Sequence, residues 1–247
     1  MKTTKGDFHS TPSWPAEEER YAFIRDALAR WAGPPGDLLE LGAAPGVQSM
    51  ALARAGYQVT AVDLGEASDA WGDASEGSME AGFAEVGVTL LLWDLERFPY
   101  PLPDESFDVV LLTEVIEHLR DYPAKAVVEA KRVLRPGGIL VLTTPNAASP
   151  QRRMQLLRGR SVYTPMVDWL FGLPHARHAR EYTASELREV IAHAELELVS
   201  LRGRHFHRKS GRQGGIARAA KGLVDTLGRL SPTLGANLAI VARRPRL

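Results

Sequence analysis

The segment Leu38-Leu-Glu-Leu-Gly42-Ala-Ala-Pro-Gly46 joins an apolar run to a stretch with helical spacing. The apolar run, residues 37–42, predicts a buried strand, and residues 47–55 predict a helix. Glycines at such a junction let backbone N–H groups approach a ligand closely. We therefore expect a strand–turn–helix unit that binds a ligand at its turn.

The same alternation continues on both sides of this segment. A helix is expected from Ser13 to the breaker Gly33-Pro-Pro-Gly36, and a longer helix over residues 114–134. Further strands are expected at residues 57–63, 86–93, 107–112 and 138–144. The run 107–112 is apolar nearly throughout, which is typical of a strand buried on both faces. The expected fold class is therefore α/β, with a mostly parallel sheet and helices on both faces.

The second half of the chain is less regular but is assigned to the same single domain, residues 1–247. Thr183-Ala-Ser-Glu186 is a capping box that predicts a helix to about Ala194, and strands are expected at 196–201 and 237–242. Two insertions, residues 147–180 and 203–235, are expected to cover the acceptor site. Residues 1–12 are expected to form a loose N-terminal arm.

The composition excludes several classes of protein. The chain has no cysteine, which excludes disulfides, thiolate nucleophiles and metal sites built on cysteine. Its 30 basic and 30 acidic residues cancel, which argues against a general nucleic-acid binder, so no DNA partner is expected. No apolar run is suited to a secretory signal or a membrane span, and we expect a cytoplasmic location.

Asp63 ends the second expected strand, 21 positions after Gly42. A carboxylate at this place can accept hydrogen bonds from both hydroxyls of a ribose. A dinucleotide would also need room for its pyrophosphate, which G-x-G-x-x-G normally provides, whereas Ala44 occupies the second glycine position here. The pattern suits a nucleoside ligand without phosphates. The alternative is structural: the glycines serve a tight turn and Asp63 caps a helix.

Together with further motifs, these residues resemble the class I S-adenosylmethionine-dependent methyltransferases. Glu40, Gly42, Ala44 and Gly46 represent the first motif of that family, with Ala44 as a departure from glycine. Three more motifs follow in order: Trp93-Asp94-Leu95, Phe107-Asp-Val-Val-Leu-Leu-Thr-Glu114-Val-Ile-Glu117-His118-Leu119, and Arg132-Val-Leu-Arg-Pro-Gly-Gly-Ile-Leu140. The resemblance covers roughly residues 35–202 and the last strand. It implies a Rossmann-like, seven-stranded sheet whose last strand is antiparallel.

The resemblance also implies a cofactor and its contacts. The cofactor would be S-adenosyl-L-methionine and the product S-adenosyl-L-homocysteine. Asp63 would bind the ribose, and Asp94 would bind the adenine amino group. The full set of expected cofactor-binding residues is Glu40, Gly42, Ala44, Gly46, Asp63, Leu64, Asp94, Leu95 and Glu114.

Glu114, Glu117 and His118 have the spacing of residues on one face of the expected helix. Two carboxylates and an imidazole there could bind a divalent metal. Related E-x-x-E-H patterns hold a metal in small-RNA 2′-O-methyltransferases and in some ubiquinone-pathway O-methyltransferases, and the resemblance extends that possibility to these residues. Alternatively, the acids complement the dipole of the helix. As a third possibility, His118 is the catalytic residue, a general base that takes a proton from a substrate hydroxyl.

The acceptor side is suggested by His178-Ala-Arg-Glu-Tyr-Thr183. This segment resembles one found in relatives that act on sugars, lipids and small metabolites. His178, Arg180 and Tyr182 are therefore candidate substrate-binding residues. The alternative is that Tyr182 packs in the core and Arg180 pairs with a surface acid.

Charge is unevenly distributed along the chain. Residues 57–96 contain nine acids and no Lys or Arg, whereas residues 147–222 contain fourteen bases and six acids. The basic region coincides with the expected insertions. It indicates an anionic acceptor or a membrane surface, with a solvated basic face as the alternative.

The function expected from these features is S-adenosylmethionine-dependent O-methylation of a small molecule, a glycoside or a lipid-linked metabolite. One alternative is an RNA 2′-O-methyltransferase, although the Lys-Asp-Lys-Glu tetrad of such enzymes cannot be placed and an RNA partner is not expected. Another alternative is a non-catalytic protein that binds S-adenosylmethionine and acts through a partner. The sequence does not specify an oligomeric state.

Overall fold

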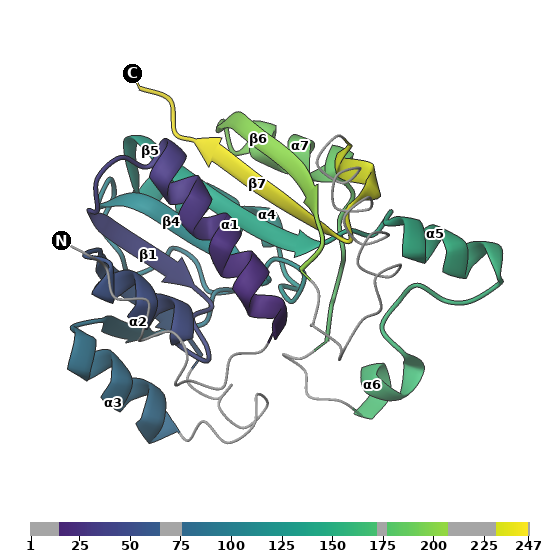
Figure 1. The fold of residues 1–247 in the computed structure, drawn as a ribbon, viewed down its shortest axis with the longest axis horizontal. Helices are drawn as coiled ribbons and strands as arrows, with labels where there is room; N and C mark the ends of the chain where they lie inside the picture. The colour runs from purple at the N-terminus through teal and green to yellow at the C-terminus, as the bar shows by residue number, and fades with distance from the viewer. Residues whose placement is uncertain (1–14, 65–75, 172–176, 207–230, 247) are drawn as a thin grey trace, which may run out of the picture.

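The computed structural model describes residues 15–64, 76–171, 177–206 and 231–246. Within these ranges the chain forms a seven-stranded sheet in the order β3-β2-β1-β4-β5-β7-β6. Helices cover both faces of the sheet (Figure 1). The N-terminal segment expected at residues 1–12 and most of the expected insertion at 203–235 lie outside the described residues.

The strands are β1 (Asp37–Leu41), β2 (Gln58–Asp63), β3 (Thr89–Leu92), β4 (Phe107–Thr113), β5 (Leu134–Pro145), β6 (Glu197–Arg204) and β7 (Asn237–Arg243). The helices are α1 (Pro15–Trp31), α2 (Val47–Arg54), α3 (Glu76–Val86), α4 (Pro123–Val133), α5 (Pro150–Leu157), α6 (Met166–Phe171) and α7 (Ala184–His193). A short 3₁₀ turn, η3 (Pro232–Leu234), precedes β7.

The pairing of the strands confirms the expected topology. Strand β1 pairs in parallel with β2 on one side and with β4 on the other, so that Leu38 lies opposite both Val59 and Val109. Strand β7 is antiparallel to both of its neighbours, β5 and β6. The last strand therefore reverses direction while the other six run the same way.

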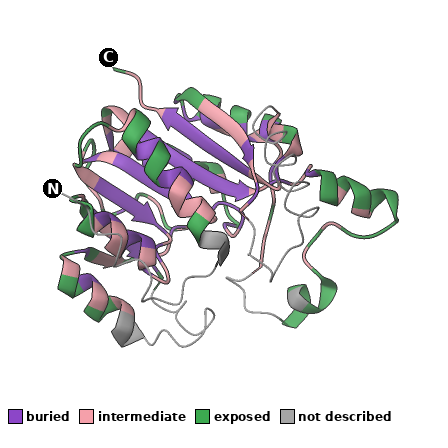
Figure 2. Ribbon diagram, viewed as in Figure 1, coloured by how far each residue is buried: buried purple, intermediate pink, exposed green. Residues whose placement is uncertain are grey.

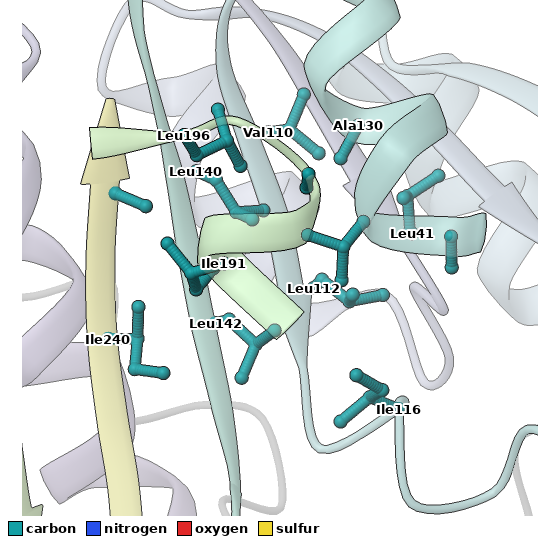
Figure 3. Close-up of a cluster of buried hydrophobic side chains, with 14 of the residues drawn as sticks. Leu41, Val110, Leu112, Ile116, Ala130, Leu140, Leu142, Ile191, Leu196 and Ile240 are labelled. Carbon is teal, nitrogen blue, oxygen red and sulfur yellow. The ribbon is translucent and has the colours of Figure 1, made fainter. Parts of the chain in front are cut away.

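Alternate residues of the central strands point into two separate cores. On one side of the sheet, Leu38 and Val109 pack with side chains of α1, α2 and α3. On the other side, Leu112 and Leu142 pack with side chains of α4 and α7, as the close-up in Figure 3 shows for Leu112, Leu142 and Ile191. The inner strands are mostly buried, while the outer surfaces of the helices are exposed (Figure 2).

One expected helix starts much later than its sequence indicates. Residues 114–122 form a turn, and α4 begins only at Pro123. Glu114 and Tyr122 both have positive φ, at 55° and 57°. Pro123 explains part of the shift, because a proline disfavours helical conformation in the residue before it. Glu114, Glu117 and His118 therefore do not share a helix face, and acids in a first helical turn are not the reason for their spacing.

Three helices were not expected from the sequence. Helix α3 carries Gly77 and Gly82, which lower helical propensity and weaken its pattern. Helices α5 and α6 lie in the insertion at residues 147–180. Helix α5 buries none of its residues, and the described side chains of α6 are exposed. Neither helix therefore needs the periodic apolar residues by which a buried helix is predicted from sequence. Among the described residues, no helix combines the length and apolar character needed to span a bilayer.

Candidate cofactor and catalytic site

The expected functional residues gather at one edge of the sheet, where the parallel strands β1 to β4 end. Gly42 follows β1, Asp63 ends β2, Asp94 follows β3, and Glu114 follows β4. The chain crosses from one side of the sheet to the other between β1 and β4, and crevices at such switch points are where open α/β sheets bind ligands.

The turn after β1 depends on its two glycines. Gly42 and Gly46 have φ values of 74° and 86°, a region that glycine adopts without steric cost. A Cβ on Gly42 would lie 2.4 Å from Cγ2 of Val115, and one on Gly46 would lie 2.7 Å from Cε1 of Phe83. The glycines therefore serve the tight turn, as the structural alternative predicted. Within this turn the N–H of Gly42 donates to the carbonyl oxygen of Val62 at 2.8 Å, and the N–H of Gly46 donates to that of Ala43 at 2.7 Å.

Asp63 fastens this turn to the end of β2. One carboxylate oxygen accepts a hydrogen bond from the backbone N–H of Ala44 at 2.8 Å, and the other accepts one from Leu64 at 2.8 Å. The side chain is buried, and each oxygen keeps a lone pair for a further donor. Asp63 thus shapes the site, and its ribose contact stays a prediction.

Glu40 lies beneath the turn and is also buried. The amide of Gln48 donates to one of its oxygens at 2.7 Å, and the hydroxyl of Ser49 donates to the other. Burial raises the pKa of Glu40 to about 7, and the Ser49 hydrogen bond and the charge of Arg20 oppose that rise. Glu40 therefore links β1 to α2 from below the cofactor turn.

Asp94 is more exposed than Asp63. Its carboxylate accepts a hydrogen bond from the backbone N–H of Glu96 at 2.9 Å and lies 3.6 Å from the guanidinium of Arg97. Leu95 beside it is buried, whereas Leu64 after β2 is exposed, as an edge of a ligand site would be. These contacts stabilise a turn at the end of β3, and the adenine contact of Asp94 stays a prediction.

Two carboxylates lie beyond β4, a buried one on Glu117 and a half-buried one on Glu114, and each has one oxygen shielded from solvent. Glu114 accepts a weak hydrogen bond from the amide of Asn237 at 3.4 Å, while its other oxygen has no partner among the described residues. Glu117 accepts a hydrogen bond from Thr144 at 2.9 Å, and it too has one oxygen without a described partner. Burial raises the pKa of Glu114, and burial and the neighbouring Glu114 raise that of Glu117. Buried acceptors of this kind fit a ligand that brings donors or positive charge.

His118 and His178 face each other beside these carboxylates. Their rings lie edge to face with centroids 4.9 Å apart. The Nδ1 atom of His118 lies 3.2 Å from the carbonyl oxygen of Arg177. The Nδ1 atom of His178 lies 2.8 Å from a carboxylate oxygen of Glu181, which also binds the guanidinium of Arg152. The Nδ1 atom of each ring is thus held by an oxygen atom, a carbonyl for His118 and a carboxylate for His178.

The expected metal ligands are regrouped by the fold. Ligand atoms of Glu117, His118 and His178 all lie within 4.8 Å of one another. Glu114 is not in this group of three, although the sequence spacing suggested it. Histidines that ligate metals usually present their other nitrogen to a carboxylate or a carbonyl, as both histidines do here. The residues present therefore fit a divalent cation as well as a substrate hydroxyl.

Two expected substrate residues have structural partners. Arg180 lies at the surface and pairs with Glu186 at 2.7 Å, while Tyr182 is buried in the core beneath α7. The hydroxyl of Tyr182 has no partner among the described residues. Their roles in substrate binding stay predictions.

The sequence did not single out Arg20, Glu181 or Val115. Arg20 lies in α1, and its charge lowers the pKa of both Glu40 and Glu114. Glu181 connects His178 to Arg152, and Val115 covers Gly42. The only signal for Glu181 in the sequence was the presence of an acid within residues 178–183. Its role cannot be inferred until its contacts with His178 and Arg152 are known.

Comparison with known proteins identifies close similarities. A family model described as a methyltransferase domain matches residues 16–201. A probable S-adenosylmethionine-dependent methyltransferase of Mycolicibacterium smegmatis is 33% identical over 187 residues, which are 73% of this chain and 61% of that protein. A ubiquinone biosynthesis O-methyltransferase of Hahella chejuensis is 30% identical over 206 residues, 78% of this chain and 79% of that protein.

A solved structure shares the fold. The S-adenosylmethionine-dependent methyltransferase of Mesorhizobium loti superposes with a TM-score of 0.59 at 18% identity, covering 89% of this chain and 96% of that one. Several curated relatives are longer than the matched region, since the matches span 51% to 61% of four of them.

The buried Glu40 predicts a pH-dependent stability. Its pKa is higher in the folded protein than in the unfolded chain, so the folded state binds the proton more tightly. The free energy of unfolding should therefore fall as the pH rises from about 4.5 to about 7. Glu40→Gln keeps acceptor and donor atoms for Gln48 and Ser49 and should show a smaller fall. Urea unfolding at pH 5 and pH 8 measures both slopes.

An exposed acid provides the control for this measurement. Glu197→Gln removes a carboxylate from the surface of β6 and should leave the wild-type pH profile unchanged. Equal falls in stability for wild type and Glu40→Gln would show that Glu40 does not carry the effect.

Proposed function

Because this chain belongs to the class I S-adenosylmethionine-dependent methyltransferase family, we propose that it transfers a methyl group to a hydroxyl oxygen of a small molecule, glycoside or lipid-linked metabolite. The observation that carries the choice of oxygen is the His118–His178 pair at the carboxyl end of the sheet. A hydroxyl needs its proton removed to become a good nucleophile, and an oriented imidazole can take that proton. The similarity to a protein named as an O-methyltransferase supports the same choice.

The residues at the ends of β1 to β4 fit S-adenosylmethionine. The turn from Gly42 to Gly46 offers a close backbone approach, and Asp63 offers buried acceptors. The unpartnered oxygen of Glu114 offers an acceptor for an N–H group of the ligand. When bound, S-adenosylmethionine would supply an activated methyl group on a positively charged sulfonium. The chain's own task is to hold the donor and the acceptor oxygen in line.

In this proposal, the His118–His178 pair takes the proton from the acceptor hydroxyl. Glu181 fixes the ring of His178, and the carbonyl of Arg177 fixes the ring of His118. We assign the proton to the imidazole of His118, against which the ring of His178 lies edge to face. The two rings lie on different segments, so the site is complete only when residues 177–182 pack against the turn after β4.

A second candidate mechanism uses a divalent cation at the same place. Glu117, His118 and His178 form a three-ligand cluster whose histidines are held by outer partners. A cation there would lower the pKa of a coordinated hydroxyl instead of leaving the proton to His118. The acceptor's chemical class is the same in both mechanisms. An RNA acceptor and a non-catalytic role lack an observation of this kind.

Asp63→Ala should weaken S-adenosylmethionine binding at least tenfold. Loss of charge-assisted hydrogen bonds costs roughly 1.5–3 kcal/mol, and the Ala44 N–H would also lose its anchor. Isothermal titration calorimetry measures the affinity. Asp108→Ala is a matched control, because Asp108 also accepts a backbone N–H but lies at the opposite end of β4. Unchanged affinity in Asp63→Ala would remove the ribose assignment.

His118→Ala should lower turnover about 10²- to 10⁴-fold while cofactor affinity is retained, because a general base acts on the acceptor's proton. The acceptor is first identified by incubating the protein with labelled S-adenosylmethionine and fractionated cell extract, followed by mass spectrometry of the labelled product. His193→Ala, an exposed histidine of α7, is the control and should keep full turnover. Wild-type turnover in His118→Ala would exclude this base.

Chelation separates the two mechanisms. If His118 acts as the base, turnover should survive dialysis against EDTA and should not rise on addition of Mg²⁺ or Mn²⁺. If the cluster holds a cation, EDTA should abolish turnover and Mn²⁺ should bind with an electron paramagnetic resonance signature that His178→Ala removes. The spectroscopic readout does not depend on knowing the acceptor.

A further inference from the structure

Residues 150–171, here called the arm, extend away from the sheet. They comprise α5, α6 and the segment between them, and Figure 1 shows both helices standing clear of the helical layers. Helix α5 buries none of its residues. Figure 2 shows the arm exposed along most of its length, in contrast to α1 and α2, which each bury one side.

The arm is exposed although much of it is apolar. Phe171 is 83% exposed, Leu157 is 82% exposed and Tyr163 is 85% exposed. The other exposed large apolar side chains of the arm are Met154, Leu156, Met166, Val167, Trp169 and Leu170. Soluble domains rarely leave so many large apolar side chains together in water, and such surfaces mark sites of interaction. An interaction partner is therefore needed to remove them from water.

The charge of the arm selects the kind of partner. Its bases are all arginines, at positions 152, 153, 158 and 160, and its only acid is Asp168. Arg153, Arg158 and Arg160 are exposed. A surface that combines exposed apolar side chains with positive charge is complementary to an anionic lipid bilayer, whose headgroups attract the arginines while its acyl chains accept the apolar groups. Trp169 and Tyr163 suit the boundary between these two zones.

We propose that the arm is a docking surface for an anionic lipid bilayer. Its apolar side chains enter the outer part of the acyl layer, and its arginines lie at the level of the phosphates. The docking itself is independent of the proposed function. Its consequence for catalysis rests on the proposed function, because the arm would hold the acceptor side of the site at the membrane.

The arm is fastened to the segment that carries His178. The guanidinium of Arg152 binds both Glu181 and the carbonyl oxygen of Val162. Arg177 binds the carbonyl oxygen of Trp169, and its guanidinium lies 5.3 Å from the centre of that indole ring. Docking through the arm would therefore place the His118–His178 pair near the lipid surface.

Co-sedimentation with vesicles tests this proposal. The full chain should pellet with vesicles of phosphatidylglycerol and phosphatidylcholine and remain in solution with phosphatidylcholine alone. The triple variant Leu157→Ser/Leu170→Ser/Phe171→Ser should lose at least nine-tenths of the bound fraction without any change in charge. The matched control, Val128→Ser/Leu198→Ser, alters exposed apolar residues on α4 and β6 and should bind as the wild type does.

A fluorescence measurement locates the contact independently of binding strength. Vesicles that carry brominated acyl chains should quench tryptophan emission in the wild type, and Trp169→Phe should remove most of that quenching. Equal pelleting of the wild type and the triple variant would overturn the proposal, because basic residues elsewhere would then explain the binding. A dimer in solution that the triple variant converts to monomer, with no vesicle binding, would assign the arm to contact between copies.

Discussion

The parallel pairing of β1 with β4 is the constraint on which the rest of the site depends. Both strands are buried on both faces, and their register places Leu41, one residue before Gly42, opposite Leu112, two residues before Glu114. The crossover between the two halves of the sheet opens at this pair. Because all parallel strands end at the same edge, the glycine turn, Asp63 and Glu114 meet there although they are far apart in sequence.

Buried negative charge is the main electrostatic cost of this arrangement. Glu40, Glu114 and Glu117 are all removed from water near the same edge, and burial raises the pKa of each. The positive charge of Arg20, in α1, opposes the rise in the pKa of Glu40 and Glu114. A cationic ligand would offset it further, since an opposite charge favours the ionised carboxylates. Carboxylates whose pKa is raised by burial in this way are frequent at functional sites.

The acceptor side is built differently from the cofactor side. The cofactor residues lie on turns anchored by the central strands, whereas His178 and Glu181 lie on a segment that joins the arm to α7. Glu181 binds both His178 and Arg152 and therefore connects the candidate catalytic pair to the arm. The candidate cofactor residues and the candidate acceptor residues are therefore anchored by different parts of the fold.

The sequence by itself determined the mostly parallel α/β sheet and the glycine turn after β1, because these follow from local periodicity and glycine conformation. The reversed last strand was implied by the resemblance to the methyltransferase family and is confirmed by the pairing of β7. It was wrong about the start of the helix expected at 114–134, since the positive φ of Glu114 and the proline at 123 delay the helix to Pro123–Val133. Only the tertiary structure decided that His118 meets His178 and that Glu117 joins them, because residues 177–182 reach this place through packing over a long stretch of chain. The sequence likewise did not determine that the apolar residues of the arm are exposed, since burial depends on which surfaces the folded chain brings against each other.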